Sequence, residues 1–396
     1  MSILSRLRHY STSILSPNSS TPLTRSKKKK NARSALRLLK SETNPERILD
    51  ICSAAALTPD FHLHRAVLSL AVSKLAAAHH FAGIRTLIDY LKTRPDLCRC
   101  RNEKFLSHSI VLYGQANMLD HAIRTFAEDL PSPRSVKSLN DLLLASLLAK
   151  NYKELTRIYL EFPKTYSIQP NVYTYNIVIK AFAESGSTSS FYSVIAEMDK
   201  NNIKPNVTTM NNSLSGFYRE GKFDDVGKVL KLMEEKYRVF PAITTYNVRI
   251  ESLCKLKRSS EAKALLEGMV CNGRKPNVVS YACLIHGFCK EGDLEEAKRL
   301  FKYMKSRGRG YLPNGECYFM LVHFLCRGGE FVAALEFAKE CIGKGWVPNF
   351  TTMKSLVNGL AGASKVDEAK EVIKQIKEKF AENVDKWDEI EAGLDK

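Results

Sequence analysis

The stretch Pro-Asn-Val-Val-Ser-Tyr-Ala at residues 276–282 decides the fold, because close variants of it recur along the chain at regular intervals. Each copy begins with a proline and leads through hydroxyl and aromatic residues into an apolar run. The prolines are Pro170, Pro205, Pro241, Pro276, Pro313 and Pro348, with steps of 35, 36, 35, 37 and 35 residues. Asparagine follows five of these six prolines, and Ala242 follows the other. Self-similarity at a fixed period predicts a repeat architecture rather than one compact core.

Two antiparallel helices of about a dozen residues are expected in each repeat. In one repeat the apolar residues Val248, Ile250 and Leu253 recur at roughly helical spacing. A polar break, a second helical run such as residues 295–304, and a closing Gly or Pro follow. So short a helix pair cannot bury its apolar face alone and must stack on its neighbours. We therefore predict an all-α fold, a right-handed superhelical α-solenoid of helix-turn-helix repeats of about 35 residues.

Composition agrees with a folded chain. The 396 residues are 44% apolar and 26% charged. The sequence contains no long apolar window without charges, so no membrane-spanning helix is expected.

Two positions that recur with the repeat are expected to lie in the hydrophobic core. Counted from the residue after each asparagine, position 20 is a small alanine that permits close helix approach, and position 27 is an apolar methionine. These residues are Ala262, Ala297, Ala334 and Ala369, and Met198, Met233, Met269 and Met304.

The repeat resembles the 35-residue pentatricopeptide repeat. The resemblance rests on Thr-Tyr-Asn at residues 245–247, Cys-Lys at 289–290, Glu-Glu-Ala at 295–297, Met304 and the closing Pro-Asn. Clear repeats are predicted at 136–171, 172–206, 207–242, 243–277, 278–314 and 315–349. The predicted domains are a segment at 1–30, N-terminal helices with a degenerate repeat at 31–102, the repeat array at 103–384 with a partial repeat at 350–384, and an acidic tail at 385–396.

The N-terminal segment is typical of an organellar transit peptide. Residues 1–41 contain ten Lys or Arg and no acidic residue, with many hydroxyl residues between them. Arg8-His9-Tyr10-Ser11 resembles a mitochondrial processing site, so we expect a mitochondrial protein, with the plastid as the alternative. The other interpretation is a disordered basic tail that binds nucleic acid through Lys27–Lys30. Without residues 1–41 the net charge falls from +18 to +8, so the remaining chain is only moderately basic.

The resemblance implies a mode of RNA recognition. The fifth residue of a repeat and its last residue would meet one base edge, and the second residue would flank the base. Amide side chains suit this role because each offers a donor and an acceptor. The candidate base-contacting residues are Asn140, Asn171, Asn176, Asn206, Asn211, Asn247, Asn277, Asn314 and Asn349.

Three of the resulting pairs are Asn with Asn, which by resemblance favour pyrimidines. The other repeats depart from the family's pattern. Their fifth or last positions hold Ala242, Ala282, Phe319 and Lys354. Second positions also vary along the array, with Lys137 and Glu316 where an apolar residue is usual. Because a good bidentate base contact contributes about 1–3 kcal/mol, three readable repeats predict only weak or partial sequence specificity.

Position 13 carries a cation in four consecutive repeats: Arg219, Lys255, Lys290 and Arg327. Regular spacing of positive charge suits a tracked phosphate backbone, so these are the candidate phosphate-binding residues. The alternative is that they are solvated helix ends, where cations are favoured in any case.

No metal site, cofactor or catalytic residue is expected. His286-x-x-Cys289 and His323-x-x-Cys326 look like zinc half-sites, but they occupy equivalent places in neighbouring repeats. Cysteine at position 12, with Cys254 as the third copy, is a usual buried small residue of this repeat. The chain has no phosphate-cradling Gly-rich loop and no metalloprotease motif.

Three functional hypotheses follow. The first is a ribosome-associated RNA-binding scaffold supporting mitochondrial translation, with single-stranded or ribosomal RNA and mitochondrial ribosome proteins as partners and no membrane. It draws on residues 34–49 and 113–117, which resemble short plant repeat proteins of mitochondrial ribosomes. The second is a transcript-specific factor that stabilises or processes one organellar message. The third is a helical scaffold that binds only proteins.

Overall fold

The computed structural model describes residues 34–55, 61–92, 103–380 and 384–394, and within them all regular structure is helical. The predicted all-α repeat fold is confirmed. The chain divides into two compact units, unit 1 up to Pro205 and unit 2 from Asn206 onward. The proposed transit segment at 1–30, including Lys27–Lys30, lies outside the described residues.

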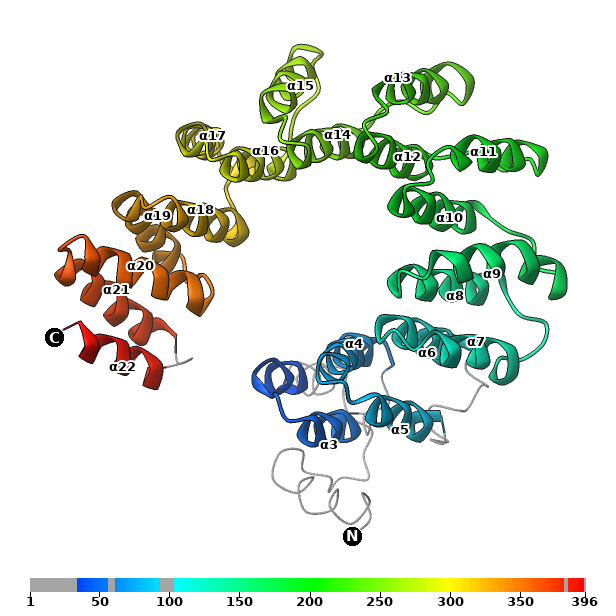
Figure 1. Ribbon diagram of the computed structural model, residues 1–396, viewed down its shortest axis with the longest axis horizontal. Coiled ribbons are helices and arrows are strands. Elements are labelled where there is room, and N and C mark those ends of the chain that lie inside the picture. The colour runs from blue at the N-terminus through cyan, green and yellow to red at the C-terminus, as the bar shows by residue number, and fades with distance from the viewer. Residues whose placement is uncertain (1–33, 56–60, 93–102, 381–383, 395–396) are drawn as a thin grey trace, which may run out of the picture. The chain divides into compact units, whose positions relative to one another are not determined.

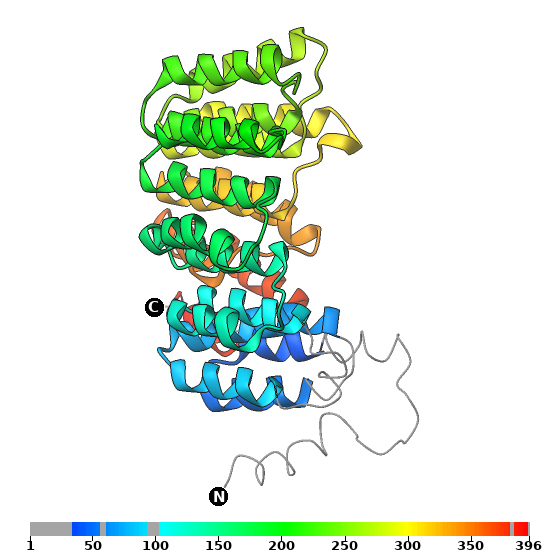
Figure 2. The same cartoon turned by 90° about the vertical axis from the view of Figure 1, so that its right-hand side faces the viewer.

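Unit 1 is a stack of helix pairs that follows a short helix at residues 34–41. Its elements are α3 (Pro45–Ala55), α4 (Phe61–Ala77), α5 (Phe81–Lys92), α6 (Glu103–Gln115), α7 (Leu119–Arg124) with a π-helical turn η1 (Thr125–Asp129), α8 (Val136–Leu148), α9 (Tyr152–Thr165), α10 (Val172–Ser185) and α11 (Ser190–Lys200). The first helices of the pairs, α4, α6, α8 and α10, pack against one another in sequence order. Their axes are nearly parallel where they lie one above another in Figure 2.

Unit 2 continues the pattern. Its elements are α12 (Val207–Arg219), α13 (Phe223–Lys231) with a π-helical turn η2 (Leu232–Lys236), α14 (Ile243–Lys255), α15 (Ser259–Cys271), α16 (Val278–Glu291), α17 (Leu294–Ser306), the 3-10 turn η3 (Arg309–Tyr311), α18 (Gly315–Arg327), α19 (Phe331–Gly343), α20 (Phe350–Gly362), α21 (Val366–Lys379) and α22 (Val384–Gly393). The first helices α12, α14, α16, α18 and α20 again form a row, and each packs on its own second helix (Figure 1).

Local sequence explains where the helices begin and end. Asn171 caps α10, and its side-chain oxygen accepts hydrogen bonds from the backbone N–H groups of Tyr173 at 3.0 Å and Thr174 at 3.1 Å. These bonds satisfy donors that an α-helix leaves unpaired at its start. At the other end, Gly186 adopts a left-handed φ of 77° that a side chain would disfavour. Asn277 and Gly292 delimit α16 in the same way.

The residues that recur at positions 20 and 27 form the core. The four alanines are fully buried, and the four methionines are at most 1% exposed. Both predictions are confirmed. The tyrosine at position 4 adds a second buried layer, in which Tyr175, Tyr281 and Tyr318 are fully enclosed. Because each layer is shared by adjacent helix pairs, a repeat is stabilised by its neighbours rather than by its own contacts.

The acidic C-terminal segment forms helix α22, which packs on the last repeat. Trp387 is 2% exposed and stacks on Phe350 with ring centroids 4.8 Å apart. Lys377 of α21 forms ion pairs with Asp388 and Glu391, both at 2.5 Å. This helix therefore covers the apolar end of unit 2, as terminal caps of repeat arrays do.

Candidate nucleic-acid interface

The structure brings Asn140 and Asn171 together. Asn140 Nδ2 donates to Asn171 Oδ1 at 3.2 Å, and the Thr174 hydroxyl donates to Asn140 Oδ1 at 2.6 Å. Each Asn140 group therefore has one partner and keeps capacity for a second hydrogen bond. The two amides are held in a fixed relation at the start of α10, where a base edge could meet both.

Asn247 and Asn277 repeat this geometry in unit 2. Asn247 Nδ2 donates to Asn277 Oδ1 at 3.3 Å, and the Ser280 hydroxyl donates to Asn247 Oδ1 at 2.6 Å. The hydroxyl on the third residue of the next helix thus plays the same part in both sites. Two of the expected pairs are therefore brought together by direct contact. The third expected pair is Asn176 with Asn206. Asn176 lies in α10 of unit 1 and is 7% exposed, and Asn206 caps α12 of unit 2.

The last-position asparagines have a second role that the sequence analysis missed, because each is the N-cap of the following helix. Their side chains accept backbone N–H bonds at 2.9–3.1 Å. The capping residues are Asn171, Asn206, Asn277, Asn314 and Asn349. A hydroxyl residue three places later, as in a capping box, was the available signal for all of them except Asn314, where Cys317 holds that place. Asn314 and Asn349 are also exposed to solvent.

Asn211 is different, because its partner position holds Ala242. Asn211 is 9% exposed, and its Nδ2 donates to the Thr244 hydroxyl at 3.4 Å instead. Its Oδ1 is buried without a hydrogen-bond partner. An alanine cap cannot supply the amide oxygen that fixes Asn140 and Asn247, so this repeat lacks the paired amides.

Ala282 leaves space at the fifth position of the next repeat. A pocket of about 350 Å³ lies between α14, α16 and α18 at this point. Its wall includes Val279, His286, Lys290 and Met320 as well as Ala282. In the following repeat Phe319 fills the fifth position and packs near Gly315. Neither residue offers an amide to a base edge.

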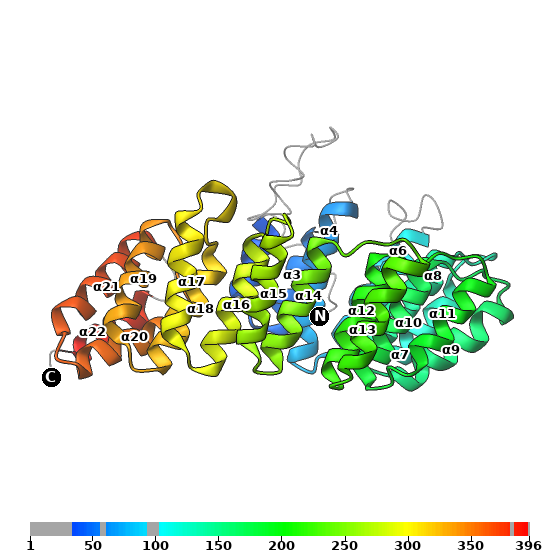
Figure 3. The same cartoon turned by 90° about the horizontal axis from the view of Figure 1, so that it is seen from above.

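The four position-13 cations lie in the last turn of α12, α14, α16 and α18, and all four are exposed. These helices follow one another along unit 2 (Figure 3), so the cations recur at equivalent ends. Lys255 also pairs with Glu251 on its own helix at 2.5 Å. The corresponding residues of unit 1 are Leu148 in α8 and Glu184 in α10.

Tyr173 is a further exposed candidate that the sequence analysis did not single out. It occupies the second position of its repeat, and it is 67% exposed. An exposed aromatic ring at the position expected to flank a base offers a stacking surface. Its place in the repeat was the signal that could have identified it.

The thiols at position 12 are buried, as expected. Cys254, Cys289 and Cys326 are at most 6% exposed, and burial raises the pKa of Cys289 and of Cys326 to about 12. Such thiols are poor nucleophiles and poor metal ligands near neutral pH. In the described parts of the chain no group of three or more His, Cys, Asp or Glu is placed to hold a metal ion. Every helix there is also too short or too polar to cross a bilayer.

Family models match most of the array. Models described as PPR repeat match residues 208–237, 244–274, 272–305 and 351–379, one described as PPR repeat family matches 170–217, and one described as pentatricopeptide repeat domain matches 134–185. The chain belongs to the pentatricopeptide repeat family.

Three relatives from Arabidopsis thaliana are similar over most of their length. A mitochondrial pentatricopeptide repeat-containing protein is 50% identical over 98% of this chain and 94% of its own. The small ribosomal subunit protein mL103 is 31% identical over 82% and 78%, respectively. A second mitochondrial pentatricopeptide repeat-containing protein is 30% identical over 83% and 77%. The mitochondrial localisation predicted from the N-terminal segment is confirmed by these relatives.

Proposed function

We propose that this protein binds single-stranded or ribosomal RNA with its first helices and supports mitochondrial translation as a ribosome-associated component. One observation carries the RNA part of the proposal. Helix α14 presents both the paired amide of Asn247, 3.3 Å from Asn277, and the exposed cation Lys255 near its C-terminal end. A single helix thus offers a base-reading group and a phosphate-binding group. Phosphate contacts position a nucleic acid and base contacts specify it.

The ribosomal part of the proposal is supported by the relative named as a small ribosomal subunit protein. The site itself agrees with that role. Only some repeats carry amide pairs, whereas a factor that selects one transcript needs many readable repeats, because each contributes only about 1–3 kcal/mol of discrimination. A protein that binds structured ribosomal RNA needs affinity and recognition of RNA shape more than it needs to read many consecutive bases.

Co-sedimentation with mitochondrial ribosomes tests the proposal. Full-length protein in a mitochondrial extract is centrifuged through sucrose with and without ribonuclease, and RNA contacts are mapped by crosslinking. We expect the protein to travel with a ribosomal subunit and to crosslink to ribosomal RNA. A free protein crosslinked to one messenger RNA would favour the transcript-specific hypothesis instead. Ribosome binding without any RNA crosslink would favour the protein-binding scaffold.

A further inference from the structure

An aromatic cluster lies on the first helices of unit 2, where the amide pairs are missing. We define the α16–α18 aromatic cluster as His286, His323 and Phe324. The Phe324 ring lies 6.0 Å from the His286 ring and 5.3 Å from the His323 ring, centroid to centroid. His323 is exposed, whereas His286 and Phe324 are half-buried. His323 Nδ1 lies 3.4 Å from the Thr352 hydroxyl of α20. The rings of two adjacent repeats therefore form one continuous surface.

Phe324 is an exception at its repeat position. The first helices of the other clear repeats and of the partial repeat carry a small residue at position 10: Ala145, Ala181, Gly216, Ser252, Gly287 and Gly359. The small residue allows close helix approach, since a Cβ at Gly287 would lie 2.7 Å from Cys254 Cβ and one at Gly359 would clash with Phe331. At this position Phe324 instead places its ring against His286 of α16. The pocket that includes Ala282 and His286 lies between α14, α16 and α18.

Positive charge adjoins the cluster. Lys290 follows His286 by one helical turn and Arg327 follows His323 by one turn, and both cations are exposed. Two carboxylates, Glu251 and Glu316, also line the pocket, and Glu251 pairs with Lys255 of its own helix, which offsets its charge. Aromatic rings beside cations are the combination that binds single-stranded nucleic acid without regard to sequence.

We propose that the α16–α18 aromatic cluster, with Lys290 and Arg327, holds single-stranded RNA by base stacking and phosphate contact instead of reading base edges. The proposal rests on the RNA binding proposed above and gives unit 2 a second binding mode. A base would stack on the exposed edge of the cluster while the flanking phosphates contact the two cations. Affinity contributed here would be independent of base identity, because every base has a stacking face.

Fluorescence titration of the full-length chain tests this. The probe is a single-stranded RNA carrying 2-aminopurine, whose emission is quenched on stacking, and a matched RNA with abasic positions serves for comparison. We expect Phe324→Leu, which keeps an apolar side chain, and His323→Ala, which changes an exposed residue, each to lower affinity roughly tenfold and to reduce quenching. Affinity for the abasic RNA should stay the same. Tyr303→Leu, which removes an exposed ring on second helix α17, is the control and should change neither quantity.

The outcomes separate this inference from the proposed function. If the unmodified protein binds no RNA at low salt, the RNA part of the proposed function fails as well. If it binds RNA and both variants retain affinity and quenching, only the stacking inference is overturned. If the variants keep RNA affinity but lose ribosome co-sedimentation, the cluster is a protein contact and the inference is again overturned. Because His323→Ala alters an exposed side chain, a folding defect of Phe324→Leu would not remove the test.

Discussion

The two units differ in what their first helices present. In unit 1, Asn140 is fixed against Asn171, but the ends of α8 and α10 carry Leu148 and Glu184. In unit 2, four helix ends carry exposed cations, while the fifth positions from α16 onward hold no amide: Ala282, Phe319 and Lys354. Amides discriminate between bases, whereas cations add affinity that salt weakens. We expect a division of labour in which both units read bases, through Asn140 with Asn171 and Asn247 with Asn277, while unit 2 alone adds phosphate affinity.

The largest effect should come from reversing the cations of unit 2. We expect Lys255→Glu, Lys290→Glu and Arg327→Glu together to weaken RNA binding roughly several hundredfold, because each lost charge-assisted contact costs about 1.5 kcal/mol or less. The slope of log affinity against log salt should shrink by about 2, at roughly 0.7 for each phosphate released. Fluorescence polarisation over a series of salt concentrations measures both quantities.

The matched control reverses three exposed cations on the second helices of the same unit. Lys228, Lys231 and Lys302 changed to Glu alter the net charge equally. If this control weakens binding as much as the first variant, general charge attracts the RNA and the position-13 residues are solvated helix ends.

The next contrast is the loss of stability at low pH, which we expect from a buried histidine of unit 1. Burial of His108 in α6, with added repulsion from Arg65 and Lys137, lowers the pKa of its imidazole to about 4. The unfolded chain, with a histidine pKa near 6.5, takes up the proton first as the pH falls, so stability is lost below about pH 6.5. Between pH 7 and 5 this single group should reduce the free energy of unfolding by about 2 kcal/mol.

Urea denaturation at the two pH values measures the loss. His108→Gln, which cannot ionise, should show a smaller decrease than the unmodified chain. Equal decreases in both proteins would show that His108 does not govern acid sensitivity.

Base selection gives a third contrast. Asn140→Ala removes one of the paired amides, and we expect about tenfold less discrimination at one RNA position, with little change for a mismatched RNA. The same substitution at Asn211 should leave selection unchanged, since Ala242 already deprives that repeat of a pair. Binding to a randomised RNA pool followed by sequencing measures both. Equal losses of selection would show that the pair is not the reading unit.

Restoring the missing cap should remove one difference between the units. Ala242→Asn would supply an oxygen that can accept from the Thr245 N–H and from Asn211 Nδ2, as Asn171 does for Thr174 and Asn140. We expect the free energy of unfolding to rise by about 1 kcal/mol, as for other alanine-to-asparagine cap changes. Ala282→Asn, the same change inside helix α16, should bring no gain. A gain at both positions in urea denaturation would refute the capping explanation.

The sequence was sufficient for the repeat and its core, because Ala262 and Met269 recur at fixed positions and periodicity follows directly from helix geometry. It was insufficient for the hydrogen bonds of the candidate interface. The cap that Asn171 forms on α10 is local, but its hydrogen bond with Asn140 depends on how two neighbouring repeats stack, which a pattern within one repeat does not contain. The aromatic contact of Phe324 with His286 likewise joins adjacent repeats. Contacts within a repeat were predictable, and contacts between repeats required the structure.

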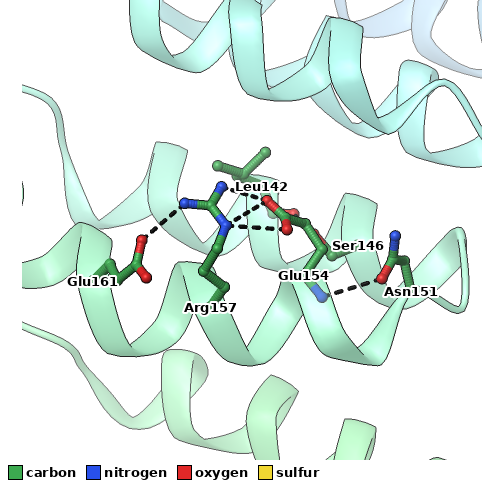
Figure 4. A network of polar contacts seen from close by, with 6 residues as sticks. All are labelled: Leu142, Ser146, Asn151, Glu154, Arg157 and Glu161. Atoms are coloured by element: carbon green, nitrogen blue, oxygen red, sulfur yellow. Dashed lines mark hydrogen bonds and ion pairs between the residues drawn. The ribbon is translucent and has the colours of Figure 1, made fainter.

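The smallest effect is expected at a charged network on the second helices of unit 1. Arg157 of α9 donates to Glu154 at 2.9 Å and to Glu161 at 2.8 Å, while Asn151 caps the same helix (Figure 4). The Arg157 side chain is 41% exposed, so solvent screens these pairs. Arg157→Ala should lower the free energy of unfolding by about 0.5 kcal/mol or less, and RNA affinity should not change. Urea denaturation and polarisation measure the two quantities. A loss of RNA binding comparable with that of the unit 2 variant would mean that unit 1 also holds phosphate, and the division of labour between the units would be wrong.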